Sequence, residues 1–296
     1  MTGSRWAALL ARCTFPPTGT EVTCAVSGGA DSLALLVLAV AAGCRATAVH
    51  VDHGLRSGSA AEADVVRDAA ARVGAGFRAE QVDLAPGPNL EARARAARYA
   101  VLPADVLTGH TADDQAETVL LNLLRGAGLD GLAGMRAEGH PVLALRRAET
   151  EAVCAAEGLS PITDPSNADP VHRRNRVRSE LLPLLNDIAQ RDVVPILARQ
   201  AALLRAEAEI LDFAADELDA TDAELMAGWL PAVTRRAIRR WLTDGQDHPP
   251  DAATVERVLQ VARGKAKGTD VGGGRRVVRT ANVLRLEAGP VAGPAR

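Results

Sequence analysis

Residues 22–32 read VTCAVSGGADS, an apolar run that breaks abruptly into serine, glycine and aspartate. Its first five residues form the β-branched, apolar stretch typical of a buried parallel strand, and residues 33–42 predict an apolar helix. The loop between them would lie at the carboxyl end of a strand and the amino end of a helix. Unpaired backbone N–H groups and the helix dipole favour a phosphate at such a place. We therefore expect nucleotide phosphates to bind this loop, which consists of Ser27, Gly28, Gly29, Ala30, Asp31 and Ser32.

Asp31 is an unusual residue for a bare anion site, because its carboxylate would repel a phosphate unless a divalent cation lay between them. We therefore expect a nucleotide together with Mg²⁺, and Asp31 as a ligand of the metal. The loop differs from a Walker A loop, which would carry a lysine directly after its last glycine. A strand-to-helix turn that only needs small residues is the plainer alternative.

Composition gives little global indication of a partner, but charge is unevenly distributed along the 296 residues. Residues 235–285 hold twelve Lys or Arg against five Asp or Glu, a local net of +7 that leaves −10 for the rest of a chain of net charge −3. This asymmetry is typical of a nucleic-acid-binding tail on an acidic catalytic domain, or of a solvated basic face. Aromatic residues make up only 2%, so base stacking on aromatic side chains is not expected to dominate recognition.

The four cysteines are widely separated and form no C-x-x-C pair, so neither a disulfide framework nor a zinc site is expected. No signal peptide opens the sequence, and no run of eighteen apolar residues could cross a membrane. We expect a cytoplasmic protein without a membrane partner.

Strand and helix patterns alternate through the first part of the chain. Further strands are predicted at 46–51, 77–82 and 106–108, with helices at 60–73 and 89–99. The alternation predicts an α/β fold with a doubly wound, Rossmann-like parallel sheet, which binds ligands at the carboxyl ends of its strands.

Helical periodicity replaces this alternation beyond Pro183. We expect one long helix at 188–218, two shorter helices at 230–242 and 252–263, and then a basic β-hairpin. The predicted domains are a catalytic domain at 1–187 and a smaller, mainly helical domain at 188–296.

The second predicted strand ends in HVDHGLRSGS, which gathers His50, Asp52 and His53 near its carboxyl end. Two histidines and an aspartate could coordinate a metal, but a loop of the nucleotide pocket is favoured because a second acidic partner is missing. Arg95, on the predicted helix at 89–99, either pairs with Glu91 or contacts a phosphate of ATP or RNA.

Residues 108–135 read TGHTADDQAETVLLNLLRGAGLDGLAGM and hold the densest group of polar side chains. Asp114 and Glu117 stand three apart, so they share one face at the first turn of a helix. They suit Mg²⁺ or the ammonium group of an amine substrate, with His110 close by, or they merely complement the helix dipole. Arg125 follows this helix and precedes a glycine-rich loop.

Arginines cluster in two further places. Residues 173–178 hold four of them, Arg173, Arg174, Arg176 and Arg178, and residues 235–240 read RRAIRR. Such clusters are solvated surface in many proteins, but with RNA as substrate they would contact phosphates.

Five stretches, in order across about residues 22–185, resemble the tRNA(Ile)-lysidine synthetases of the PP-loop ATP pyrophosphatase superfamily. They are SGGADS, HVDHGLR, the helix that begins with N-L-E, GHTADDQAET with LLRGAGLDGLAGM, and DPSN with the arginines after it. The resemblance implies that free lysine is joined to C2 of the wobble cytidine of a tRNA(Ile) with a CAU anticodon, with ATP and Mg²⁺ consumed or bound in the reaction.

Residue roles follow from the same resemblance. Catalytic roles are expected for Asp31, His110, Asp114, Glu117 and Arg125, with Asp31 and Asp114 at the metal. Contacts to ATP are expected for the loop at 27–32 and for His50, Asp52, His53, Arg95 and Gly109. Contacts to tRNA are expected for Arg173, Arg174, Arg176 and Arg178. The basic charge of the C-terminal part, and not the resemblance, adds Arg235 and Arg236, and a homodimer is a further expectation.

Two departures from the family pattern keep other functions open. The family's R-P-L-L becomes VLAL here, where Arg146 and Arg147 could substitute, and Ser179 stands where the family commonly has His. A PP-loop tRNA thiolase would activate a base in the same way, although the missing C-x-x-C pairs weigh against sulfur transfer. A noncatalytic nucleotide- and RNA-binding module would tolerate both departures, but it would not need Asp31, Asp114 and Glu117.

Overall fold

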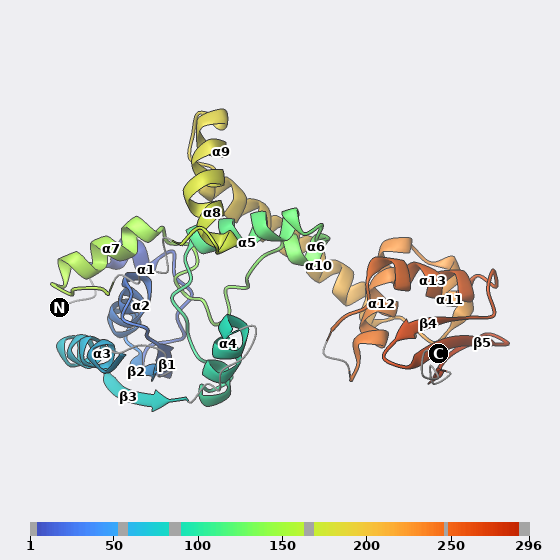
Figure 1. Cartoon of the computed structure of the whole chain (residues 1–296), viewed down its shortest axis with the longest axis horizontal. Coiled ribbons are helices and arrows are strands. Elements are labelled where there is room, and N and C mark those ends of the chain that lie inside the picture. The colour runs from blue at the N-terminus through green and yellow to red at the C-terminus, as the bar shows by residue number, and fades with distance from the viewer. Residues whose placement is uncertain (1–4, 53–58, 83–89, 163–168, 246–247, 290–296) are drawn as a thin grey trace. The chain divides into compact units, whose positions relative to one another are not determined.

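The computed structural model describes residues 5–52, 59–82, 90–162, 169–245 and 248–289. Two compact units divide the chain between Leu204 and Arg205 (Figure 1). The first unit carries a parallel sheet with helices, and the second unit carries helices with an antiparallel sheet.

The parallel sheet of the first unit is ordered around β1 (Glu21–Ala25). On one side β1 pairs with β2 (Arg45–Asp52), which pairs in turn with β3 (Gly76–Gln81). On its other side β1 bridges Leu107, whose N–H donates to the Thr23 carbonyl at 2.8 Å. The chain passes from β1 to β2 and β3 on one side of β1 and then returns to place Leu107 on the other side. A topological switch point therefore lies at the carboxyl end of β1.

Alternation along the strands gives the sheet two apolar faces. Cys24 lies opposite Ala48, and both belong to the largest apolar cluster of the unit. The next pair, Ala25 and Val49, points to the other face and packs in a smaller cluster with Leu102 and Val106. Both faces are therefore covered, as parallel sheets require.

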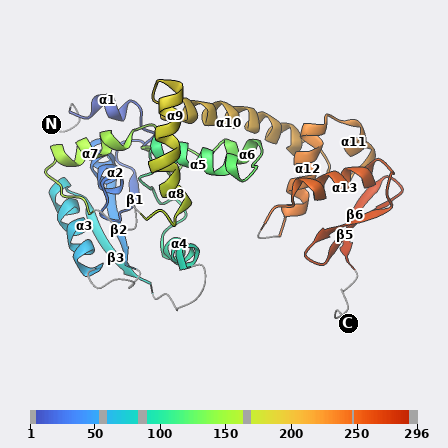
Figure 2. The ribbon, with the colours of Figure 1, turned by 45° about the horizontal axis from the view of Figure 1, so that its top comes forward.

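Helix α2 (Ala30–Ala41) is the centre of the larger cluster. Every residue from 33 to 39 is buried, because this helix is apolar on all sides. It packs on the sheet beside α3 (Ser59–Val73), and α7 (Arg147–Ala156) packs on α2, as Figures 1 and 2 show. The helix α4 (Leu90–Val101) precedes Leu102 of the smaller cluster.

A layer of helices completes the first unit. The stripe Ala112, Ala116 and Leu120 of α5 (Ala112–Leu124) packs against the chain from Val177 to Ala198. That segment forms α8 (Arg173–Arg176), a π-helical turn η2 (Val177–Leu181), α9 (Leu182–Ala189) and the start of α10 (Val194–Asp216). Of the two short helices, α1 (Ala7–Leu10) precedes β1 in the sequence and α6 (Leu129–Leu132) follows α5.

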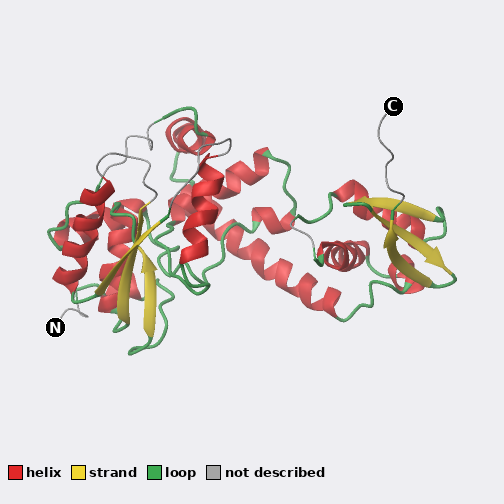
Figure 3. Cartoon of the chain, turned by 60° about the horizontal axis from the view of Figure 1, so that its bottom comes forward, coloured by secondary structure: helices red, strands yellow, loops and turns green. Residues whose placement is uncertain are grey.

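The second unit has its own core. It contains α11 (Ala223–Gly228), α12 (Pro231–Thr243) and α13 (Ala252–Ala262), which pack on an antiparallel sheet of β4 (Gly268–Gly272), β5 (Arg275–Thr280) and β6 (Val283–Ala288) (Figure 3). Local sequence explains the helix starts. Asp222 caps α11, Asp251 caps α13, and Pro231 opens α12 where no intrahelical N–H partner is needed.

The doubly wound α/β fold is confirmed, and three details differ from expectation. The helix predicted at 188–218 is broken, because Gln190 ends α9 in the left-handed region (φ 51°) and α10 begins only at Val194. The expected hairpin is a three-stranded sheet. The units divide at residue 204 rather than near 188, since the first turns of α10 pack into the helical layer of the first unit. Among the described helices none is both long and apolar enough to cross a membrane.

Gly109 is required where the chain passes the first turn of α2. A Cβ at Gly109 would lie 2.5 Å from the Asp31 carbonyl oxygen and 2.9 Å from the Ser32 nitrogen, and neither backbone atom can move alone. We expect Gly109→Ala to lower the free energy of unfolding by about 1–3 kcal/mol in urea titrations. Gly128→Ala is the control, because no atom lies within 4 Å of its Cβ position. Equal losses in the two variants would contradict this steric account.

Candidate active site

The loop between β1 and α2 is held in place by its own polar atoms. Gly28 has φ +88°, a value that favours glycine, and its carbonyl accepts the Ile162 N–H at 2.9 Å. Ser32 Oγ donates to the Gly29 carbonyl at 2.9 Å and accepts the Ser27 N–H at 3.2 Å. Helix α2 begins after Gly29 without a side-chain cap, so its first N–H groups suit an anion.

A cavity of about 990 Å³ opens at this loop, at the switch point of the sheet. We call it the phosphate-loop cavity. It brings together residues from both ends of the first unit's sequence, including Ser27, Gly29, Asp31, Ser32, Gly109, His110, Asp114, Arg147, Arg174 and Arg178. The structure thus places side by side four of the predicted groups, the loop, His110, Asp114 and part of the arginine cluster.

Asp31 lies in the first turn of α2, and both of its carboxylate oxygens have partners. Thr150 Oγ1 donates to Oδ1, and Arg147 Nε donates to Oδ2 at 3.3 Å. Burial raises the pKa of Asp31 and the Asp114 carboxylate adds to this, although the Thr150 hydrogen bond and Arg147 act in the opposite direction. Since the net pKa shift is upward, ionised Asp31 would be stabilised by any further cation that approached it.

Asp114 faces Asp31 across the Arg147 guanidinium. Its Oδ2 accepts the Thr111 N–H at 2.9 Å and the Thr111 hydroxyl at 3.0 Å, which orients the carboxylate at the first turn of α5. Its Oδ1 accepts from Arg147 Nη2 at 3.0 Å. One guanidinium therefore contacts two carboxylates that come from different helices.

Glu117 is fully buried and does not line the phosphate-loop cavity. Arg178 donates to both of its oxygens, at 2.6 and 3.1 Å, while Arg174 Nε lies 3.4 Å and Arg147 Nη1 3.6 Å from the carboxylate. Three guanidinium groups thus surround one carboxylate, which offsets the cost of burying its charge. The sequence indicated Glu117 as a group that contacts substrate, whereas the structure gives it arginines as partners.

Thr108, His110 and His140 form a small network close to Leu107, which bridges β1. His140 was not among the residues predicted from the sequence. The Thr108 hydroxyl lies 2.8 Å from His110 Nδ1 and 2.5 Å from Nδ1 of His140. The two imidazole rings meet edge to face with centroids 4.7 Å apart. His110 reaches the cavity from this network.

Comparison with known proteins identifies the family. The model of the PP-loop domain matches residues 4–185. A tRNA(Ile)-lysidine synthase of Nocardia farcinica is 42% identical over 280 residues, which cover 88% of each chain. The chain belongs to the tRNA(Ile)-lysidine synthase family.

Another relative agrees with this assignment, and one solved structure shares the fold. The tRNA(Ile)-lysidine synthase of Mycobacterium leprae is 47% identical over 242 residues, covering 75% of this chain and 74% of the relative. A U34-tRNA thiolase from Methanococcus maripaludis has a similar structure, with a TM-score of 0.53 at 18% identity over 69% of this chain and 78% of that chain. The second likeness concerns the fold alone.

In this member of the tRNA(Ile)-lysidine synthase family, Arg146 and Arg147 fasten the start of α7 to α5. Arg146 makes two hydrogen bonds of 3.0 Å to Asp113, and the Arg147 N–H donates to the same carboxylate at 2.8 Å. Burial alone would raise the pKa of Asp113, but these hydrogen bonds and the two arginine charges outweigh it and lower the pKa. In the sequence, the neighbouring pairs Asp113-Asp114 and Arg146-Arg147 were the feature that could have predicted these ion pairs.

The residues expected at the end of the second strand are only partly described. His50 and Asp52 lie within β2, and His53 is outside the described residues. His50 is buried with its Nδ1 3.0 Å from the Val26 carbonyl, and it does not line the phosphate-loop cavity. His50 therefore contacts the backbone directly after β1, where the chain enters the phosphate loop. Arg95 belongs to α4, but its side chain is likewise outside the description; Arg98 of the same helix lines the cavity.

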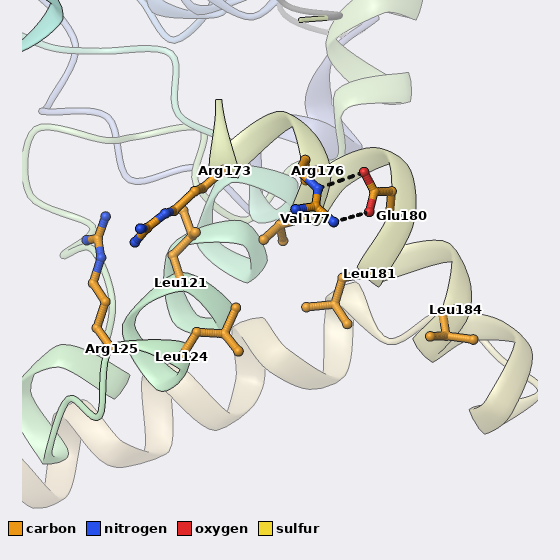
Figure 4. Close-up of a pocket in the computed structure, with 9 residues that line it drawn as sticks. All are labelled: Leu121, Leu124, Arg125, Arg173, Arg176, Val177, Glu180, Leu181 and Leu184. Carbon is orange, nitrogen blue, oxygen red and sulfur yellow. Dashed lines mark hydrogen bonds and ion pairs between the residues drawn. The ribbon is translucent and has the colours of Figure 1, made fainter. Parts of the chain in front are cut away.

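The arginine cluster of this family member faces two ways. Arg174 and Arg178 point to Glu117 and the phosphate-loop cavity, whereas Arg173 and Arg176 line a different cavity together with Arg125 (Figure 4). Arg125 follows the last residue of α5, eleven residues from Asp114, which corresponds to about 16 Å along a helix. Arg125 therefore lies at the far end of α5 from Asp114, and the catalytic role expected for it stays a prediction.

Arg235 and Arg236 are paired within the second unit. Arg236 Nε donates to Asp212 at 2.5 Å, and Arg235 lies 3.2 Å from Glu256. These pairs join α12 to α10 and α13. Their contact with tRNA remains a prediction, and each would have to exchange a carboxylate for a phosphate.

Thr150→Val removes the hydroxyl that donates to Asp31, and we expect the pKa of Asp31 to rise further, because that hydrogen bond lowers it. The pKa of Asp31 is higher in the folded state than in the unfolded state. Its contribution to the free energy of unfolding is therefore fully present below the usual pKa of 3.8 and is lost as the pH rises through the folded pKa. The variant should therefore lose about 1–3 kcal/mol at pH 7 and less below pH 3.8.

Carboxyl NMR titration and urea unfolding at several pH values measure these two quantities. Thr150→Ser is the control, because it retains the hydroxyl. A carboxyl pKa in Thr150→Val that equals or falls below that of the parent would refute the assigned role of this hydrogen bond.

Glu117→Gln tests the buried charge cluster. The amide keeps the shape of the side chain but leaves three guanidinium groups without their shared anion, so we expect a loss of about 3–5 kcal/mol in unfolding free energy. Glu180→Gln is the matched control, since Glu180 pairs with Arg176 at 2.8 Å but is exposed to water, which screens the pair. Comparable losses would mean that burial does not strengthen the dependence on Glu117.

Proposed function

We propose that this chain joins lysine to C2 of the wobble cytidine of a tRNA(Ile) with a CAU anticodon, using ATP and releasing AMP and pyrophosphate. One observation carries the proposal. In a chain of the tRNA(Ile)-lysidine synthase family, one cavity combines an anion-binding loop with Asp31, Asp114 and His110. The cavity thus offers groups for a triphosphate and for a cationic amine in the same space.

The PP-loop domain supports the use of ATP. Residues 27–32 would receive its phosphates, because the first N–H groups of α2 and the hydroxyls of Ser27 and Ser32 can donate to phosphate oxygens. Arg174 and Arg178 line the same cavity, and their charge would stabilise the negative charge that develops on the leaving pyrophosphate.

Asp31 and Asp114 fit a magnesium ion. Both contact the Arg147 guanidinium, at 3.3 and 3.0 Å, so a single cation can reach both carboxylates. Mg²⁺ prefers oxygen ligands and often takes one or two carboxylates with substrate phosphates. When bound there, Mg²⁺ would neutralise charge on the phosphates.

The same contacts indicate where the lysine ammonium group binds. Arg147 contacts both Asp114 and Glu117 on α5, but of these two carboxylates only Asp114 lines the phosphate-loop cavity. Glu117 lies one turn further along α5 and is enclosed by arginines, so we assign it the positioning of Arg147, Arg174 and Arg178. Free lysine would therefore meet Asp114 rather than Glu117.

The reaction has two steps. The oxygen on C2 of the cytosine attacks the α-phosphorus of ATP, and the bond from that phosphorus to pyrophosphate breaks. The lysine amine then attacks C2, and AMP leaves with the original oxygen. The attacking nitrogen loses a proton in this step, and His110 lines the cavity where that proton would be accepted.

Sulfur transfer is disfavoured by the cysteines. Cys154 lines the phosphate-loop cavity, but burial raises the pKa of its thiol to about 12, which keeps it protonated and unreactive. Cys24 is also buried, with a pKa raised to about 12 for the same reason. A thiolase would instead need a thiolate or a sulfur-carrying pair of cysteines.

The direct test is incorporation of labelled lysine into a tRNA(Ile) transcript with a CAU anticodon, with the methionine tRNA of the same anticodon as control. We expect incorporation into the first tRNA only, and its loss together with pyrophosphate release in Asp31→Ala. Pyrophosphate release without lysine incorporation would point to another acceptor and overturn the proposal. Unchanged activity of Asp31→Ala would remove the role assigned to that carboxylate.

A further inference from the structure

A second cavity, of about 510 Å³, lies between the end of α5 and the segment formed by α8, η2 and α9. We call it the leucine cavity. Figure 4 shows Leu121 and Leu124 of α5 on one side and Val177, Leu181 and Leu184 on the other, with arginines at its edge. Leu124 and Leu184 are 70% and 53% exposed, and they adjoin the other apolar residues of this cavity, so the apolar surface is contiguous, as it is at interaction sites.

Two of the arginines at this edge have no acidic partner among the described residues. Arg176 pairs with Glu180 at 2.8 Å, but in the described part of the chain neither Arg125 nor Arg173 has an ion pair. In Figure 4 the side chains of Arg125 and Arg173 extend to the same side of the cavity. The leucine cavity therefore combines an apolar floor with two available positive charges.

The elements that line this cavity also line the phosphate-loop cavity. Along α8 and η2, Arg174 and Arg178 face the phosphate-loop cavity, and Arg173 and Val177 face the leucine cavity. On α5, Asp114 lines the first cavity and Leu121 the second. A polymer held with one nucleotide in the phosphate-loop cavity would therefore find the leucine cavity within a few nucleotides along the same two elements.

We propose that the leucine cavity binds an unpaired nucleotide of the RNA substrate, with its base against the leucines and adjacent phosphates on Arg125 and Arg173. This proposal rests on the proposed function, because it takes RNA as the substrate. Guanidinium groups pair with phosphates and stack on bases, so the two arginines match both parts of a nucleotide. The apolar floor offers no hydrogen bonds to base edges, so the site contributes affinity and not base identity.

The charge of the cavity also argues against a second copy of the chain as its occupant. If two copies met through the same patch, the carboxylate that this patch offers would be Glu180, which already pairs with Arg176. Arg125 and Arg173 would then be buried without a carboxylate from the patch, which is costly. A phosphate supplies the missing negative charge directly.

The test measures tRNA affinity as a function of salt concentration for the parent chain and for Arg125→Gln/Arg173→Gln. On a single strand each phosphate contact contributes about 0.7 to the slope of log affinity against log salt, so the double variant should lose about 1.4. Its affinity near 0.1 M salt should fall roughly tenfold or more. Leu184→Ser should weaken binding and leave the slope unchanged, because it removes apolar contact and no charge.

Matched controls are available in the first unit. Arg45→Gln removes an exposed charge at the amino end of β2, the end of the sheet away from the site, and Leu203→Ser replaces a leucine that is also 53% exposed. Both should bind tRNA as the parent does, and melting temperatures check that all variants fold. A double variant with the parent's affinity and slope would overturn the proposal, as would a change of oligomeric state without a change in RNA binding. Because RNA binding is measured without lysine transfer, a parent that binds tRNA but transfers no lysine refutes the proposed function alone.

Discussion

The Arg147 guanidinium is the contact on which the arrangement of the active site depends. It lies within 3.6 Å of three carboxylates, those of Asp31 on α2 and of Asp114 and Glu117 on α5. Without a cation among them these carboxylates would repel one another, and the two helices would separate at the point where the substrates are expected to bind. Since Arg147 opens α7, one residue fixes the relative positions of three helices.

This constraint has a consequence for substrate binding. Arg147 is placed where a magnesium ion or a lysine ammonium group would contact Asp31 and Asp114, so the substrates would meet a site whose negative charge is already compensated. The pKa of Asp31 is nevertheless raised, because burial disfavours its ionised form more than Thr150 and Arg147 favour it. Cation binding at this place would therefore be an exchange of partners and not the neutralisation of a bare acidic site.

Arginines and leucines of the segment 173–184 contribute to both the phosphate-loop cavity and the leucine cavity. Its inward side chains stabilise buried Glu117 and line the phosphate-loop cavity, and its outward side chains form the leucine cavity. The π-helical turn at Val177–Leu181 lies within this segment and shifts the faces of the helix relative to a regular α-helix. A chain with few aromatic residues would in this way bind RNA through guanidinium groups and aliphatic side chains.

The sequence by itself determined the α/β class, the strand-to-helix phosphate loop and the presence of α5, because each depends on neighbouring residues, although it favoured Asp113 or Asp114 as the cap of α5 where the structure has Thr111. The loop needs glycine at φ +88°, and the first turn of α5 needs a Thr111 and an Asp114 that bond to each other. Only the tertiary structure decided which charges meet. The sequence placed Asp114 and Glu117 on one helix face, but it could not show that one lines a cavity and the other lies behind three arginines. Nor could it separate Arg174 from Arg173, because burial and long-range pairing depend on the packing of segments about sixty residues apart, as in the bond from Arg178 to Glu117.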